Sequence, residues 1–202
     1  MKAPTRRRPE AAAGYTLVEV LASMAVLATG LLGIAALQGS AATANQRAQE
    51  LTTATNLARR WQERLRRDAM HWSAPSQTNS VSNIQLTWYF RDLLSQPTTN
   101  WMIPVQPSGL TATPELAAAD YFGNDVLVTS PQTYYCTHIR LTRLVANELV
   151  RAEVRVWWYR RGAERLADYA NCGATSVLQA MGRDTSNLRW VYLTQTIARH
   201  EL

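Results

Sequence analysis

Hydrophobic residues form one long run near the start of the chain and shorter alternating runs near its end. The early run, "GYTLVEVLASMAVLATGLLGIAALQ", extends from Gly14 to Gln38, and its only charged residue is Glu19. A helix of that length can cross a bilayer. The apolar core of a secretory signal peptide is shorter, and helix-favouring sequence continues here without a proline until Pro75. The pattern therefore favours a membrane-spanning helix over a cleaved signal peptide.

After Gln38 the pattern becomes one-sided. Leu57, Trp61, Leu65 and Ala69 recur at helical spacing and form one apolar stripe. The other faces of this segment carry Arg59, Arg60, Glu63, Arg64, Arg66, Arg67 and Asp68. The sequence predicts a continuous helix from Tyr15 to about Met70, roughly 84 Å long at 1.5 Å per residue. Its first half is apolar all round, and its second half is expected to pack on a sheet.

Three later stretches alternate with a period of two, at residues 135–145, 149–159 and 188–198. In the second, one face carries Val150, Ala152, Val154, Val156 and Trp158, while Arg151, Glu153 and Arg155 share the other. The first two are joined by "ANE", a hairpin-length loop. An antiparallel sheet with one face on the long helix follows, so the predicted fold class is α+β.

Weaker patterns lie between the helix and these strands. We expect a strand at Ser82–Phe90 and another short strand ending at Ser130. The proline-rich stretch 95–116 is expected to be an irregular surface excursion. That excursion and the loop around Cys172 are the expected contact surfaces, because they have the most irregular sequence.

The formal net charge is +6, and Lys2, Arg6, Arg7 and Arg8 against Glu10 place +3 of it in the first 14 residues. A basic cluster before an apolar helix predicts a cytoplasmic N-terminus and a translocated C-terminal part. Because so much of the charge belongs to this leader, the high isoelectric point is weak support for a nucleic-acid partner.

Cys136 and Cys172 are the only cysteines. Their spacing fits neither a redox CxxC motif nor a four-ligand zinc site. In an oxidising compartment one disulfide is the natural interpretation, with free thiols as the alternative. Such a bond would close a loop of about 35 residues, which stabilises a fold by on the order of 3–4 kcal/mol.

No catalytic signature is present. Phosphate-binding loops, HExxH and GxSxG are absent, and the three histidines are dispersed. "DYFGND" at Asp120–Asp125 lacks the spacing of a calcium loop and is interpreted as a turn. We therefore expect neither an enzyme nor a cofactor or metal.

The junction Gly14–Glu19, "GYTLVE", follows a short basic leader and opens an apolar helix. It resembles the prepilin signature of type IV pilins and type II secretion pseudopilins. The resemblance implies that a prepilin peptidase cuts between Gly14 and Tyr15 and N-methylates Tyr15. It also implies that Glu19, the fifth residue of the mature chain, pairs with the N-terminal amine of a neighbouring subunit. The alternative is that Glu19 only reaches the headgroup region at the membrane edge.

"GLLGIAALQ" at Gly30–Gln38 resembles the PilV-type minor pilins, and the absence of a helix-kinking proline argues against a major pilin. Gly30 and Gly33 are assigned to helix packing, although glycine is common in membrane helices generally. The resemblance covers about 60 residues. It implies a cleaved leader at 1–14, a membrane and fibre-core helix at 15–38, an amphipathic continuation at 39–72 and a periplasmic β-rich domain at 73–202.

The function implied is a minor pilin of a type IV pilus, anchored in the bacterial inner membrane before assembly and present in the surface fibre afterwards. Minor pilins form priming or tip complexes with other minor pilins and meet the major pilin through the N-terminal helix, in support of twitching motility, adhesion or DNA uptake. The resemblance also implies a disulfide between Cys136 and Cys172, because many pilins fix their C-terminal loop region in this way.

Other functions stay open from the residues. A minor pseudopilin of a type II secretion system would share the N-terminal chemistry, and a membrane-tethered binding module would use the helix only as an anchor. The arginine-rich helix with Trp61 and Trp72 could follow nucleic-acid phosphates. We do not favour nucleic acid as a partner, because Trp61 belongs to the apolar stripe.

Overall fold

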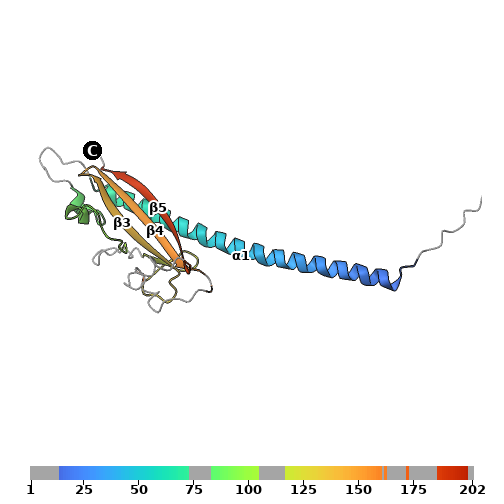
Figure 1. The fold of residues 1–202 in the computed structure, drawn as a ribbon. Coiled ribbons are helices and arrows are strands. Elements are labelled where there is room, and N and C mark those ends of the chain that lie inside the picture. Colours follow the sequence, from blue (N-terminus) through green and yellow to red (C-terminus); the bar gives the residue numbers. More distant parts are fainter. Residues whose placement is uncertain are drawn as a thin grey trace, which may run out of the picture. The chain divides into compact units, whose positions relative to one another are not determined.

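The computed structural model describes residues 14–72, 83–104, 117–160, 162, 172 and 186–199. One helix, α1 (Leu17–Ala69), precedes two short 3-10 helices, η1 (Asn83–Leu86) and η2 (Arg91–Leu94). Five strands follow: β1 (Ala118–Ala119), β2 (Asp125–Val126), β3 (Tyr135–Val145), β4 (Leu149–Tyr159) and β5 (Leu188–Ala198) (Figure 1). The predicted α+β class is confirmed. The basic leader lies outside the described residues.

The chain divides into two compact units, residues 1–47 and 48–202, so the boundary falls inside α1. Within the second unit the strands form one antiparallel sheet in the order β2-β1-β3-β4-β5. The three long strands have the bounds that the alternation predicts. Residues 146–148 join β3 to β4, and Asn147 adopts φ 59°, a left-handed conformation that asparagine tolerates in tight loops.

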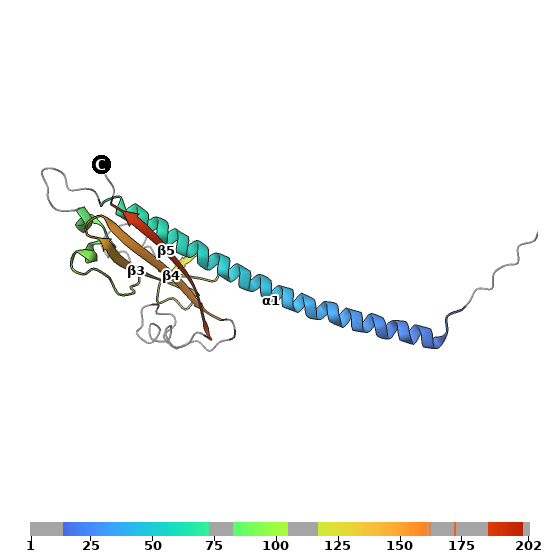
Figure 2. The ribbon, with the colours of Figure 1, turned by 45° about the horizontal axis from the view of Figure 1, so that its top comes forward.

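The main core lies between the sheet and the C-terminal part of α1. The apolar stripe at Leu57, Trp61, Leu65 and Ala69 is buried, as its helical spacing predicts. The sheet contributes the residues that alternate toward the helix, chiefly Ile139, Leu141, Val150, Ala152, Val154, Val156 and Trp158. In Figures 1 and 2 this part of α1 runs beside β5. Two side-chain contacts tie them together: Gln195 donates to the Gln62 carbonyl at 3.0 Å, and Arg66 Nε donates to Gln195 Oε1 at 2.9 Å.

Glu50 is the first buried residue along α1, and its polar atoms are all engaged. Its carboxylate accepts hydrogen bonds from the Tyr134 hydroxyl at 3.0 Å and from Trp158 Nε1 at 3.3 Å. Its backbone carbonyl accepts one from the Tyr135 hydroxyl at 3.3 Å. A buried carboxylate is tolerated only when it is hydrogen-bonded, and these aromatic donors supply the bonds. Glu50 thus marks where the helix begins to contact the sheet.

The expectation of a strand at Ser82–Phe90 is wrong. Residues 83–86 form η1, and the chain then bends so that Tyr89 and Phe90 enter the core. The cause is Asp68, whose carboxylate accepts the backbone N–H groups of Trp88 at 2.8 Å and Tyr89 at 2.9 Å. An aspartate that takes two successive backbone donors replaces the pairing a strand would need.

Asp68 itself is also placed differently from the prediction. It was assigned to the charged faces of the helix, yet it is buried beneath the η1–η2 segment. The arginines find acidic partners elsewhere: Arg60 and Arg64 contact Asp125 at 3.5 and 3.3 Å, and Arg66 contacts Glu63 at 3.7 Å.

The proline-rich stretch is only partly irregular. Thr98 and Met102 form isolated bridges with Thr142 and Ile139, so residues near them extend the sheet along the edge of β3. Residues 105–116 of this stretch lie outside the described residues. The strand expected to end at Ser130 is shorter than predicted, because β2 stops at Val126 and a turn follows.

Replacing Asp68 with alanine should lower the free energy of unfolding by about 2–4 kcal/mol, because two backbone donors then lose a charged acceptor. The comparison is Asp92→Ala, which removes an exposed carboxylate from η2. Chemical denaturation of the full chain in detergent micelles measures both. Equal stability of the two variants would contradict the role assigned to Asp68.

Candidate functional site

The first candidate site is the start of α1. Gly14, Tyr15 and Thr16 precede the helix, and Tyr15 is 82% exposed. Thr16 caps the helix: its hydroxyl and carbonyl oxygens accept the backbone N–H of Glu19 at 3.3 and 3.1 Å. A threonine followed three residues later by glutamate has the spacing of a capping box, but only the threonine half of the box is formed among the described residues. The bond between Gly14 and Tyr15 therefore lies outside helical structure.

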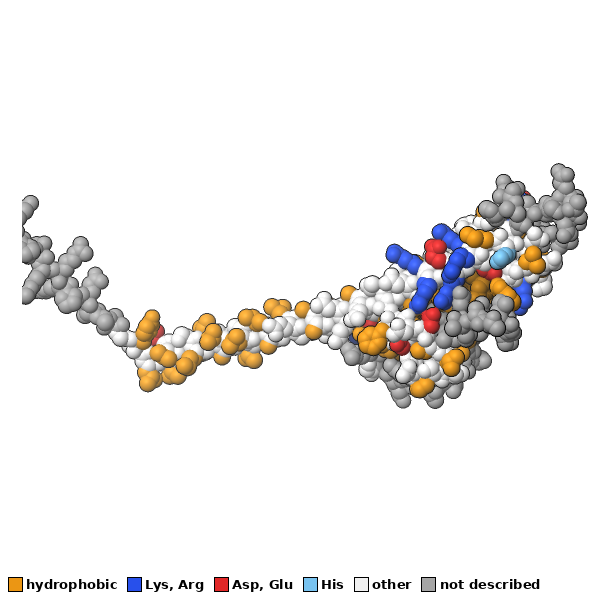
Figure 3. All heavy atoms as spheres, turned by 180° about the vertical axis from the view of Figure 1, so that it is seen from behind, with side chains coloured by type: hydrophobic (Ala, Val, Ile, Leu, Met, Phe, Trp, Pro, Cys, Tyr) orange, Lys and Arg blue, Asp and Glu red, His pale blue; other side chains and the backbone are white. Residues whose placement is uncertain are grey.

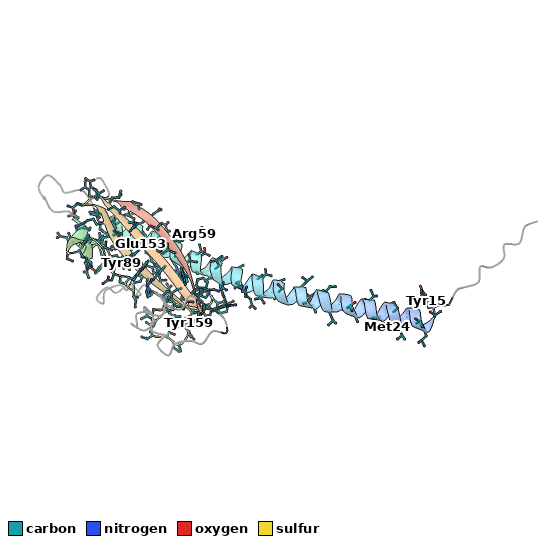
Figure 4. The ribbon with its side chains drawn as sticks, in the orientation of Figure 1. Tyr15, Met24, Arg59, Tyr89, Glu153 and Tyr159 are labelled. Atoms are coloured by element: carbon teal, nitrogen blue, oxygen red, sulfur yellow. A yellow bond between two sulfur atoms is a disulfide. The ribbon has the colours of Figure 1, made fainter. Side chains whose placement is uncertain are left out.

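The helix that follows exposes its apolar residues all round. Leu17, Val18, Met24, Val26 and Leu32 are each more than half exposed, and no described residue before Glu50 is buried. Figure 3 shows hydrophobic side chains along this part of α1, and Figure 4 shows Tyr15 and Met24 projecting from the chain. An apolar surface of this extent requires a lipid or protein partner. It is the one described helix that is long and apolar enough to cross a membrane, a test that a signal sequence also passes.

Three hydroxyl groups inside this segment are satisfied by the helix itself. The hydroxyls of Ser23, Thr29 and Thr43 donate to carbonyls three or four residues earlier. The Glu19 carboxylate has no hydrogen-bond or ion-pair partner among the described residues. An ionised group in such a segment needs a partner, and for Glu19 that partner must come from outside the described chain.

Gly30 and Gly33 are not required by packing within the chain. A Cβ added at either position would meet no described heavy atom within 4 Å. If these glycines serve packing, the helix they admit belongs to another molecule.

The second candidate site is the sheet face directed away from α1. Arg140 pairs with Glu153 through two hydrogen bonds, of 2.6 and 2.9 Å, and the Tyr192 hydroxyl donates to the same carboxylate. Arg140 holds the pKa of Glu153 below its usual value. Arg140 and Arg155 both stack over Trp101, at 4.8 and 4.1 Å from the ring centroid. Figure 4 shows Glu153 on this sheet.

The disulfide between Cys136 and Cys172 is present, and both cysteines are buried. His138, two residues beyond Cys136 and on the same face of β3, is fully buried. His138 Nε2 lies 2.7 Å from the Cys172 carbonyl oxygen, and Arg155 Nε donates to His138 Nδ1 at 3.2 Å. Because a guanidinium can only donate, Nδ1 is the acceptor and the proton sits on Nε2. The disulfide, the histidine and the arginine form one connected chain of contacts.

Sequence reasoning found part of this second site. The alternation in β4 correctly put Arg151, Glu153 and Arg155 on one face. It did not assign His138, Trp101 or Glu50 a role, because their contacts join segments far apart in the sequence. Residues 163–171 and 173–185, which include the loop flanking Cys172, lie outside the described residues.

The structure also places the 120–125 segment and the two tryptophans that the sequence analysis considered. Asp120 closes the turn at 120–124 by accepting the backbone N–H groups of Phe122 and Asn124, each at 2.9 Å. Trp61 and Trp72 are 1% and 0% exposed, so neither indole offers a stacking surface. In the described part of the chain no three histidine, cysteine, aspartate or glutamate residues are grouped so as to hold a metal ion.

No family model, curated protein or solved structure matches this chain. What the structure itself shows is a pilin-like topology: a long apolar N-terminal helix packed on a C-terminal antiparallel sheet, with a disulfide.

His138 should make folding stability depend on pH. Burial, together with the charge of Arg155, lowers its pKa to about 4, against an ordinary value of 6.5. Because the folded pKa is the lower one, the unfolded chain binds the proton first as the pH falls. The folding stability that depends on a neutral His138 is fully present above the unfolded pKa of 6.5 and is lost as the pH falls toward 4. Between pH 7 and pH 5 the loss should be about 2 kcal/mol.

The measurement is denaturant unfolding of the full chain in micelles at both pH values, with His138→Gln and His71→Gln compared. Glutamine can both donate and accept, so it can retain the two contacts of His138 without titrating. His71 is exposed and serves as the matched control. A pH dependence that is unchanged in His138→Gln would contradict the assignment.

Proposed function

We propose that this chain is a minor pilin of a type IV pilus, cleaved by a prepilin peptidase and inserted into the fibre through α1. The observation that carries the proposal is the combination at the N-terminus. A non-helical Gly14–Tyr15 junction is followed by a capped helix. The apolar part of this helix, before Glu50, carries one carboxylate, Glu19, which has no partner in the described chain. The pilin-like topology supports it independently.

Each feature has a role in the proposed cycle. An extended, exposed junction suits proteolysis, because a protease must draw the backbone into its site. Cleavage after Gly14 creates a new amine on Tyr15, four residues from Glu19. In an assembled fibre, the N-terminal amine of a neighbouring subunit is the proposed partner of Glu19, as the resemblance to prepilins implies. At about 4 Å in a low-dielectric setting such a pair offsets much of the cost of burying both charges.

Helix capping alone does not account for a carboxylate at this position in a membrane. An acidic residue near a helix N-terminus gains about 0.3–1 kcal/mol from the helix dipole. Placing a carboxylate within the hydrocarbon costs roughly 2.5 kcal/mol or more. The difference favours an additional cationic partner. Under this proposal the chain has a structural role without catalysis, in the inner membrane before assembly and in the pilus afterwards.

The first test is intact and N-terminal mass spectrometry of the protein from cells with and without prepilin peptidase. The expected chain begins at N-methylated Tyr15, and only when the peptidase is present. A chain that begins at Met1 in both strains would contradict the proposal. Co-purification then separates the two fibre systems, since recovery with secretion-system pseudopilins alone would replace the pilus by a type II secretion role.

The second test is Glu19→Gln, which keeps the side-chain volume and the Thr16 cap but removes the charge. We expect normal cleavage and about tenfold or greater loss of the protein from sheared pili, because an unpaired amine would be left in the fibre core. Glu63→Gln removes an exposed acid from the same helix and should leave incorporation unchanged. Equal incorporation of both variants would count against the fibre role of Glu19.

A further inference from the structure

Strand β5 is the last strand of the sheet on the side opposite β2, and its outer edge is unpaired within the described chain. It pairs with β4 along its whole length, from Leu149↔Ala198 to Tyr159↔Leu188, without a register shift. Figure 1 shows β5 as the final long strand. Eleven regular residues make a long edge, and an edge of that kind is a template for another strand.

The direction of the backbone groups follows from the bonds at the two ends. Arg160 N–H donates to the Asn187 carbonyl, and Arg199 N–H donates to the Glu148 carbonyl. In an antiparallel ladder every second residue faces the partner, so odd-numbered residues of β5 face β4. The backbone N–H and C=O groups of the even-numbered residues therefore point outward; these residues are Trp190, Tyr192, Thr194 and Thr196. No described residue bonds to these outward groups.

The usual protections of an edge strand are missing from β5. It contains no proline, no lysine and no bulge, and its only charged residue is Arg189. Trp190 and Tyr192 are 45% and 46% exposed on the outer face, where they could cover side chains of an added strand.

A groove of about 330 Å³ lies at the C-terminal end of this edge. Its apolar lining comes from Ala69, Met70, Ile197 and Ala198, and Arg66 and Arg199 flank it. Arg199 Nε is buried and has no hydrogen-bond partner among the described residues. A buried guanidinium donor left without an acceptor is costly, and a carboxylate entering the groove would remove that cost.

Charge decides what the edge can accept. If two copies paired through β5 in antiparallel orientation, Arg189 of each would approach Arg66 and Arg199 of the other, and like charges facing across strands are unfavourable. Among the described residues, the only acid in contact with this arginine pair is Glu63, at 3.7 Å from Arg66. A segment that brings its own carboxylate to this end meets complementary charge instead.

We propose that β5 binds an extended segment of a partner protein, which adds as an antiparallel strand and places an acidic side chain near its N-terminal end into the Arg66–Arg199 groove. The main-chain ladder supplies most of the contact, while the groove selects an acidic residue and Trp190 and Tyr192 contact the outer side chains. The inference stands apart from the pilin role, because it uses only the second compact unit.

The probe is a synthetic peptide of about ten residues, the length of a long strand, with alternating threonine and valine and two aspartates at its N-terminal end. Binding to the full chain in detergent micelles is followed by fluorescence anisotropy of the labelled peptide. Hydrogen exchange then reports protection of the outward amides of Trp190, Tyr192, Thr194 and Thr196. We expect saturable binding with protection at these amides.

Two altered peptides test the two parts of the site without changing the protein. N-methylation of alternate amides removes the ladder and should abolish binding. Lysine in place of both aspartates should weaken binding by about tenfold or more, because a charge-assisted hydrogen bond is lost and like charges meet. The proposal would be overturned if the N-methylated peptide bound as tightly as the unmethylated acidic peptide, or if the acidic peptide did not bind at all.

Variants of the chain complete the test. Arg199→Ala should reduce affinity for the acidic peptide to that of the lysine peptide. Arg59→Ala, which removes an exposed arginine of α1 labelled in Figure 4, should not. Thr194→Pro blocks the edge while sparing the bonds to β4, since its N–H points outward. If the chain instead self-associates and Thr194→Pro prevents that, the occupant is a second copy and the acidic partner is excluded.

Discussion

The burial of one apolar stripe of α1 against the sheet is the interaction on which the rest of the second unit depends. Leu57, Trp61 and Leu65 occupy successive turns, and the inward residues of β3 and β4 cover them. Each fully buried side chain of this size contributes about 1.5–3 kcal/mol from removal of apolar surface alone. Polar contacts surround this stripe. Glu50 bonds to the aromatic residues where α1 first becomes buried, Asp68 bonds to the backbone of Trp88 and Tyr89 near the end of α1, and Gln195 bonds to α1 from β5.

Periodicity predicted this part of the fold because the stripe and the strands are determined by local residue spacing. The bounds of β3, β4 and β5 and the hairpin at 146–148 follow from alternation and a short polar loop. The segment at 83–90 does not, since its alternation resembles that of a strand while Asp68, distant in the chain, captures its backbone N–H groups. A single long-range hydrogen-bond acceptor can override a short local pattern, and sequence spacing alone gives no signal of it.

The candidate sites also separate into residues that local sequence identifies and residues that only long-range contacts identify. Gly14, Tyr15 and Glu19 could be singled out from the sequence because the chemistry proposed for them depends on positions close together in the chain at the start of α1. His138 could not, because its role arises where β3, β4 and the disulfide-linked Cys172 meet. Burial makes the histidine neutral, and neutrality in turn allows its Nδ1 to accept the Arg155 donor. Among the described residues, the cation of Arg155 is therefore oriented by an uncharged neighbour and by the face of Trp101 rather than by a carboxylate.

The two units satisfy opposite requirements with the same helix. Before Glu50 the described helix exposes apolar surface and carries one carboxylate; from Glu50 onward it buries apolar surface and exposes arginines. A chain designed only to fold in water would place charges throughout the first segment, as it does in the second. No charge lies between Glu19 and Arg47, so the apolar surface there would be best covered by lipid or by other apolar helices. Under the proposed role, Glu19 would discriminate between partners in both settings: a neighbouring helix without a cation at the matching level would leave it unpaired, and one with an amine there would fix the register.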